Sequence, residues 1–86
     1  MEVHIGKVTH YWDHIQVAGV DLTAPLHVGD RIHIKGRKTD FEQPVQSIEI
    51  EHHHVDEANA GDSVGIKAMD KVREHDDVFL VVSDQQ

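Results

Sequence analysis

The chain has 86 residues and no cysteine, so it has room for one hydrophobic core and cannot form disulfides or thiolate metal sites. Sixteen acidic and eight basic residues give a formal charge of −8 with neutral histidines, which disfavours broad binding to DNA or RNA phosphates. The longest apolar run is too short to cross a membrane, and the first residues lack the features of a signal peptide. We therefore expect a cytoplasmic protein that forms a single domain over residues 1–86.

Short runs of alternating apolar and polar residues make up most of the chain. This alternation predicts β-strands with one buried face, and the glycine, proline and aspartate clusters between the runs predict turns. In chain order, the predicted strands cover residues 3–8, 17–22, 32–36, 39–52, 64–68 and 78–82. Six strands with no long helix predict an all-β fold, a single closed or nearly closed antiparallel β-barrel, because closure removes exposed sheet edges.

Two of the predicted strands contain irregularities. The alternation changes parity at Gly6, which predicts a bulge, and again after Pro44, which predicts a bulge or a change of sheet edge. The polar stretch 55–60 is compatible with one helical turn. The core of the domain is expected at about 3–82, and residues 83–86 are expected to form a frayed tail.

Three strands begin after a short turn that ends in aspartate. The turns are Gly29-Asp30, Gly61-Asp62 and the divergent copy His75-Asp76. Each aspartate is expected to bond the local backbone rather than to perform acid chemistry. The chain also has no nucleophile elbow and no phosphate-cradling loop, so we predict no catalytic residue and no enzymatic activity.

The order of these motifs resembles the second domain of elongation factor Tu, the small translation-factor β-barrel. The resemblance rests on residues 5–8 (Ile-Gly-Lys-Val), 26–30 (Leu-His-Val-Gly-Asp) and 58–66, which ends in Gly-Asp-Ser-Val-Gly-Ile. Residues 36–43 (Gly-Arg-Lys-Thr-Asp-Phe-Glu-Gln) and 48–52 (Ile-Glu-Ile-Glu-His) are similar, more narrowly, to the C-terminal barrel of collagenase-like peptidases. Free-standing elongation-factor-like proteins share this barrel.

The resemblance implies a binding module rather than a catalyst. In both families the catalytic domain is separate from the barrel, and a fold alone does not carry a function. Collagenase-like proteins are linked to RNA hydroxylation, and the elongation-factor barrel helps to hold a tRNA end. The implied partner is therefore an RNA-modifying or peptidase-like enzyme, or a ribonucleoprotein. One departure is His75, where the family's last turn usually has glycine.

An aromatic cluster around Tyr11 and Trp12 is the first candidate binding site. It holds two of the four aromatic residues in a predicted turn. Exposed aromatic side chains can dock a base or a partner loop, whereas buried ones would plug the end of the barrel. The sequence leaves both interpretations open.

Two further candidates are charged or metal-ligating. Lys35, Arg37 and Lys38 form a dense basic patch that could meet RNA phosphates, or could be a solvated turn. His52 and His54 would share one face of a strand and could bind a divalent metal, or could be a solvated strand end.

The leading functional hypothesis is an accessory binding module with a protein partner. RNA binding is disfavoured by the negative charge, and no DNA, membrane or cofactor is expected. The alternatives are a scaffolding barrel that binds only proteins and, last, a histidine-based metal binder.

Overall fold

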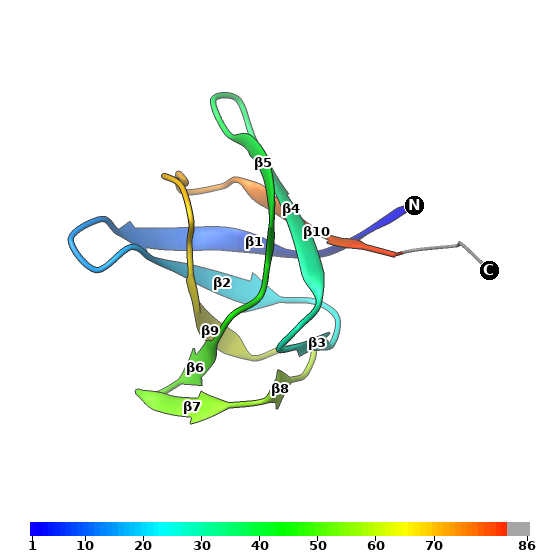
Figure 1. Ribbon diagram of the computed structural model, residues 1–86, viewed down its shortest axis with the longest axis vertical. Helices are drawn as coiled ribbons and strands as arrows, with labels where there is room; N and C mark the ends of the chain where they lie inside the picture. Colours follow the sequence, from blue (N-terminus) through cyan, green and yellow to red (C-terminus); the bar gives the residue numbers. More distant parts are fainter. Residues whose placement is uncertain (83–86) are drawn as a thin grey trace.

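The computed structural model describes residues 1–82 as ten β-strands, with no helix in that part of the chain (Figure 1). The strands are β1 (Glu2–Trp12), β2 (Val17–Leu22), β3 (Leu26–His27), β4 (Arg31–Lys35), β5 (Asp40–Pro44), β6 (Ile48–Ile50), β7 (His53–Val55), β8 (Glu57–Ala58), β9 (Ser63–Lys67) and β10 (Asp77–Val81). The predicted all-β class is confirmed, but the count of six strands is wrong. The expected frayed tail, residues 83–86, lies outside the described residues.

Short strands account for the difference in number. The long fourth run divides into β5 and β6, β7 follows it as a separate strand, and the stretch expected to form a helical turn contains β8 instead. Strands of two or three residues contain too few positions to show a period of two, so alternation cannot reveal them. Here β8 pairs with β3 through Leu26 opposite Ala58, and both side chains are buried.

The strands form one curled sheet and a small second one. The eight-stranded sheet has the order β5-β4-β10-β1-β2-β9-β6-β7, every neighbouring pair is antiparallel, and β3 pairs with β8 separately. Within residues 1–82 no ladder joins the edge strands β5 and β7, so the predicted closed barrel is wrong. The chain leaves the edge strand β5 at Pro44, which has no N–H to donate. It then crosses to β6, which lies next to β7 at the other edge of the sheet (Figure 1). The expected change of sheet edge at this proline is therefore confirmed.

Two bulges shape the longest strand, β1. The register against β10 shifts between His4 and Gly6, which confirms the predicted bulge. A second shift, against β2 between Val8 and His10, was not predicted. At Gly6 an added Cβ would lie 2.6 Å from the carbonyl oxygen of Asp21, so glycine allows the two backbones to approach closely.

The three aspartate turns share one hydrogen-bond pattern. The carboxylate of each aspartate accepts from the N–H three residues earlier: His27 N to Asp30 (2.9 Å), Asn59 N to Asp62 (2.8 Å) and Arg73 N to Asp76 (2.8 Å). The expected local role of these aspartates is confirmed. The residue before each aspartate has a positive φ: 99° at Gly29, 94° at Gly61 and 77° at His75. The third turn thus keeps the left-handed conformation without glycine.

Each turn also fastens to a buried residue elsewhere in the sequence. The residue before the aspartate donates its N–H to the carbonyl of the distant residue. The N–H of the distant residue donates in return to the backbone carbonyl of the aspartate. The pairs are Gly29-Asp30 with Val45, Gly61-Asp62 with Leu22, and His75-Asp76 with Val8, at 2.7–2.9 Å throughout. The turns therefore hold neighbouring parts of the curled sheet together.

The side chain of Gln43 bridges β5 and the end of β9, where no backbone ladder exists within the described residues. It is 1% exposed, donates to the carbonyl of Lys67 at 2.7 Å, and accepts from the N–H of Met69 at 2.7 Å. The core inside the curl consists of small and branched aliphatic side chains: Ile5, Val8, Ala18, Val20, Leu22, Leu26, Ile32, Ile34, Val45, Ile48, Ala58, Val64, Ile66, Ala68, Val72 and Val78. Among residues 1–82 there is no helix long and apolar enough to span a membrane.

Candidate functional site

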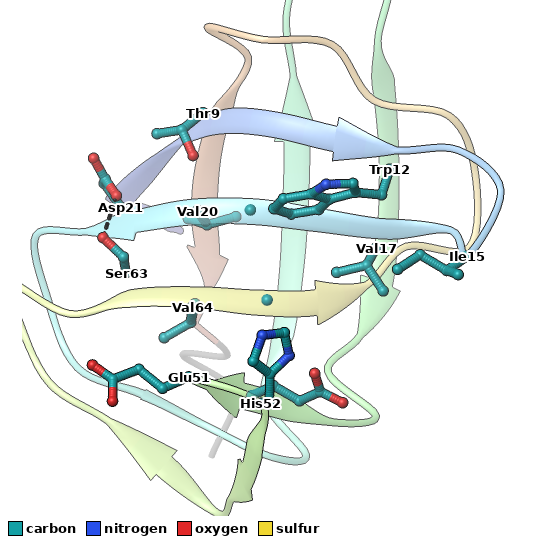
Figure 2. A pocket seen from close by; sticks show the side chains of 13 residues that line it. Thr9, Trp12, Ile15, Val17, Val20, Asp21, Glu51, His52, Ser63 and Val64 are labelled. Atoms are coloured by element: carbon teal, nitrogen blue, oxygen red, sulfur yellow. Dashed lines mark hydrogen bonds between the residues drawn. The ribbon is translucent and has the colours of Figure 1, made fainter.

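A shallow groove of about 450 Å³ lies on the outer face of β1, β2, β9 and β6 (Figure 2). Its apolar walls include Trp12, Ile15 and Val17, and Figure 2 shows the indole of Trp12 lying along β2. Trp12 is 40% exposed and packs edge-to-face on the His10 ring, with ring centroids 4.5 Å apart. An aromatic side chain that is half exposed and held in place by its neighbours is typical of binding surfaces.

Two glycines create the floor of this groove. Gly19 on β2 lies directly opposite Gly65 on β9. A Cβ at Gly19 would lie 3.2 Å from the Trp12 indole, and one at Gly65 would lie 3.2 Å from Val17. The absence of both side chains lets the indole lie low over the sheet and leaves space beside it.

Acidic side chains surround the apolar floor. Asp21, which accepts a hydrogen bond from the Ser63 hydroxyl at 2.7 Å, lies at one end, and Glu51 and His52 lie along the side opposite Trp12 (Figure 2). Glu49 also lines the groove. The groove can therefore accept an apolar side chain together with a cationic one.

The two aromatic candidates point to opposite faces of the sheet. The bulge between Val8 and His10 changes the parity of β1, so Tyr11 lies opposite the buried Ala18 and packs against the core. Trp12 lies opposite Val17 on the outer face. The predicted turn at these two residues is wrong, because β1 continues through Trp12. The exposed Trp12 also does not plug the core. Binding at either residue stays a prediction.

The basic candidates lie at the turn between β4 and β5. Arg37 and Lys38 are exposed and line a hollow of about 490 Å³ together with Gly36 and residues 73–76. Lys35, also exposed, is the last residue of β4. The fold thus adds Arg73, 35 residues beyond Lys38 in sequence, to the basic cluster. Glu74 and Asp76 also line the hollow and reduce its positive potential.

The two histidine candidates do not share a strand. His52 lies in the loop before β7 with φ 68°, and His54 lies within β7, so the premise of strand alternation fails. The Nε2 atom of His54 lies 3.3 Å from a carboxylate oxygen of Glu49, and both side chains are largely solvated. Metal binding by His52 and His54 stays a prediction.

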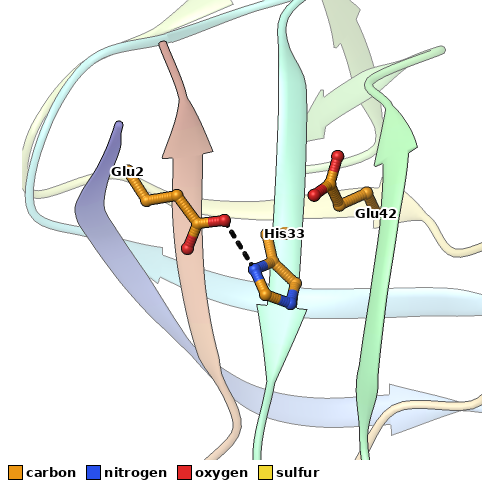
Figure 3. Close-up of side chains that lie close together, drawn as sticks. All are labelled: Glu2, His33 and Glu42. Atoms are coloured by element: carbon orange, nitrogen blue, oxygen red, sulfur yellow. Dashed lines mark hydrogen bonds and ion pairs between the residues drawn. The ribbon is translucent and has the colours of Figure 1, made fainter.

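A histidine–carboxylate cluster on the outer face of β1, β4 and β5 was missed by the sequence analysis. The Nδ1 atom of His33 lies 2.8 Å from a carboxylate oxygen of Glu2 (Figure 3). Its Nε2 atom lies 2.5 Å from a carboxylate oxygen of Asp40. Glu42 also lies beside this imidazole and pairs with Arg31 at 2.8 Å. The alternation of apolar and polar residues places His33, Asp40 and Glu42 on the outer faces of their strands. It does not show that β4 and β5 are neighbours or that β1 lies nearby, so it could not bring these side chains together.

The cluster favours the protonated form of His33. The hydrogen bond to Asp40 raises the pKa of His33 above 6.5, opposed by desolvation and assisted by the hydrogen bond to Glu2. The hydrogen bond to His33 in turn lowers the pKa of Asp40 below 3.8. Phe79 on β10 covers the ring from the side, with centroids 6.3 Å apart.

This pair predicts a pH-dependent contribution to stability in metal-free protein. The raised pKa of His33 gives stabilisation that is complete below 6.5 and lost as pH rises through the folded value, and the lowered pKa of Asp40 gives stabilisation that is lost as pH falls below 3.8. Urea unfolding with chelator should therefore show a larger loss of stability for His33→Gln at pH 5.5 than at pH 8.5. An equal loss at both values would contradict this account of the cluster.

No family model matches the chain, but it is similar in sequence to part of two proteins that are named as a protease and a collagenase. The chain is 37% identical over 81 residues to an uncharacterized protease of Methanocaldococcus jannaschii, covering 93% of this chain and 20% of that protein. It is 31% identical over 80 residues to a collagenase of Porphyromonas gingivalis, covering 91% of this chain and 19% of the relative. The chain thus spans about a fifth of the length of these relatives.

Solved structures identify the fold. The C-terminal domain of a U32 peptidase-like protein of Geobacillus thermoleovorans superposes with a TM-score of 0.87 at 19% identity, covering 93% of both chains. The selenomethionine variant of that domain gives 0.83 at 20% identity, covering 87% of this chain and 95% of the other. None of these matches is a translation factor, so that relation stays a prediction. The predicted likeness to the C-terminal domain of collagenase-like peptidases is confirmed: the chain is similar in sequence to such proteins and has the fold of that domain.

Proposed function

We propose that this chain is a non-catalytic accessory domain that docks onto a peptidase-like protein in the cytoplasm. The observation that carries the proposal is the groove in which the exposed Trp12 lies over the glycine floor of Gly19 and Gly65. The relatives support it, because about four fifths of their length lies outside the matched segment and could supply the docking surface.

The chemistry of the groove favours a segment that carries a basic side chain beside an apolar one. The apolar floor accepts the apolar group, and Asp21, Glu49 and Glu51 attract the cation. An arginine side chain suits this position, because its planar head can stack on the indole while hydrogen-bonding a carboxylate. The overall charge of −8 favours the same kind of partner.

Affinity capture from native lysate tests the proposal. The wild-type chain should retain a peptidase-like protein, identified by mass spectrometry, with or without nuclease. Trp12→Ala should lose it, since truncating a central aromatic residue typically costs about 2 kcal/mol or more of binding energy. Val28→Ala is the matched control, because Val28 is also 40% exposed and does not line the groove.

Two outcomes would contradict docking through the groove. One is retention of the partner by Trp12→Ala, and the other is the absence of any peptidase-like protein from the wild-type sample. With a purified partner segment that lacks tryptophan, the emission of Trp12 should shift to the blue on binding, and it then reports only this site because the chain has one tryptophan.

The hollow beside Arg37, Lys38 and Arg73 supports RNA binding as a second candidate function. It would connect the chain to RNA-modifying enzymes or to ribonucleoproteins, as the translation-factor resemblance implies. In the same capture experiment, this function predicts a complex that nuclease destroys and that Arg37→Glu with Lys38→Glu prevents.

A further inference from the structure

The cluster around His33 contains the donor types of a transition-metal site. His33 on β4, Glu2 on β1 and Glu42 on β5 each present one ligand atom, and these three atoms lie within 4.8 Å of one another (Figure 3). Glu42 uses Oε1 to bind Arg31, which leaves its second oxygen for another contact. Among the residues that the structure describes, this group stands out because its imidazole is largely shielded from solvent.

Carboxylates flank the His33 ring at both nitrogens. Its side chain is 14% exposed, and both ring nitrogens face carboxylates, Glu2 at Nδ1 and Asp40 at Nε2. A neutral imidazole has one N–H, so two flanking carboxylates are both satisfied only when a second proton or a metal ion occupies the other ring nitrogen. A metal ion at Nδ1 can take the place of the proton there, because Nδ1, Glu2 and Glu42 would then all bind the ion while Nε2–H donates to Asp40.

We propose that Glu2, His33 and Glu42 bind a zinc ion, and that Asp40 acts as a positioning residue for the His33 ring. An imidazole nitrogen combined with carboxylate oxygens suits zinc, whereas magnesium prefers oxygen ligands alone. A carboxylate that accepts the second N–H of a metal-bound histidine fixes the ring and its tautomer. A fourth position remains for water.

We expect side-chain rotation to assemble the site. Zinc bonds to nitrogen and oxygen of about 2.0–2.2 Å place tetrahedral ligands roughly 3.4 Å apart, so the three donor atoms must move closer by little more than an ångström. Glu2 and Glu42 are partly exposed and end in flexible side chains, while His33 and its strand can stay in place. The ion would connect β1, β4 and β5 and stabilise that part of the sheet.

Calorimetric titration of the metal-free chain with zinc chloride tests the proposal. The wild-type chain should bind one ion in this site and gain thermal stability. His33→Gln and Glu42→Gln should each weaken zinc binding at least tenfold, and Asp40→Asn should weaken it by about tenfold. Glu42→Gln leaves both His33 hydrogen bonds intact, so its effect does not depend on loss of the cluster's own stability.

The double variant His52→Gln/His54→Gln is the matched control, since it removes two exposed histidines from another part of the chain. It should retain the zinc affinity of the wild type. The proposal is overturned if the double variant loses zinc while His33→Gln keeps it, or if the wild-type chain shows no saturable zinc binding. In NMR spectra the His33 ring nitrogens should shift on zinc addition, and a shift confined to other histidines would also overturn it.

Discussion

Gln43→Met should lower the free energy of unfolding by about 2–3 kcal/mol, because it leaves two partly buried backbone groups without their partner. Methionine fills nearly the same volume as glutamine but can neither donate to the Lys67 carbonyl nor accept from the Met69 N–H. In a domain of this size such a loss corresponds to a fall in melting temperature of roughly 8–24 °C. The expected effect is large because Gln43 joins two segments that share no backbone ladder.

Urea and thermal unfolding of Gln43→Met and Gln46→Met measure this contribution. Gln46 is exposed and lies three residues along the chain, so the same substitution there should change stability by no more than about 0.5 kcal/mol. Similar stabilities for the two variants would show that water replaces the side-chain hydrogen bonds of Gln43.

The hydrogen bonds of Gln43 give a structural reason for the motif at residues 36–43. The resemblance to collagenase-like peptidases rests partly on these residues, and in the fold several of them stabilise the structure. Thr39 is buried, Asp40 bonds His33, and Gln43 bridges to the end of β9. The partners of Gln43 lie 24 and 26 residues further along the chain, so local sequence cannot show what its amide binds.

The predictable part of the fold is the part that repeats with a period of two. β2, β4, β9 and β10 carry alternating apolar residues and lie where predicted. Whether the edge strands β5 and β7 pair with each other depends on how far the sheet curls. No local sequence pattern determines this curvature. Closed barrels and curled open sheets have the same alternation along each strand, so the sequence could not distinguish them.

The candidate site was predicted only in part. Trp12 was recognised as an aromatic candidate, but its exposure depends on the second bulge of β1, which carries no glycine or proline signal. The groove beside it depends on Gly19 and Gly65 lying opposite each other, which requires the register of β2 and β9. The His33 cluster likewise requires the strand order around β4.

Asp76→Ala should cost about 2 kcal/mol of stability, about twice the cost of Asp30→Ala or Asp62→Ala. All three carboxylates accept the N–H three residues earlier, so the comparison holds the lost interaction constant. Asp76 is 4% exposed and its bond to Arg73 is partly buried, whereas the bonds of the other two turns are exposed to water. Water can replace a lost partner in the exposed turns but reaches the third turn poorly.

The third turn also packs against glycine. A Cβ at Gly36 would collide with the carboxylate of Asp76, so the β4–β5 hairpin closes directly over this side chain. Removing the carboxylate therefore leaves a space beneath the hairpin as well as an unpaired N–H. Urea unfolding of the three alanine variants, with unchanged slopes, measures the order of their stabilities. Equal losses in all three would mean that burial does not strengthen the third turn, and that the threefold pattern of turn and strand is energetically uniform.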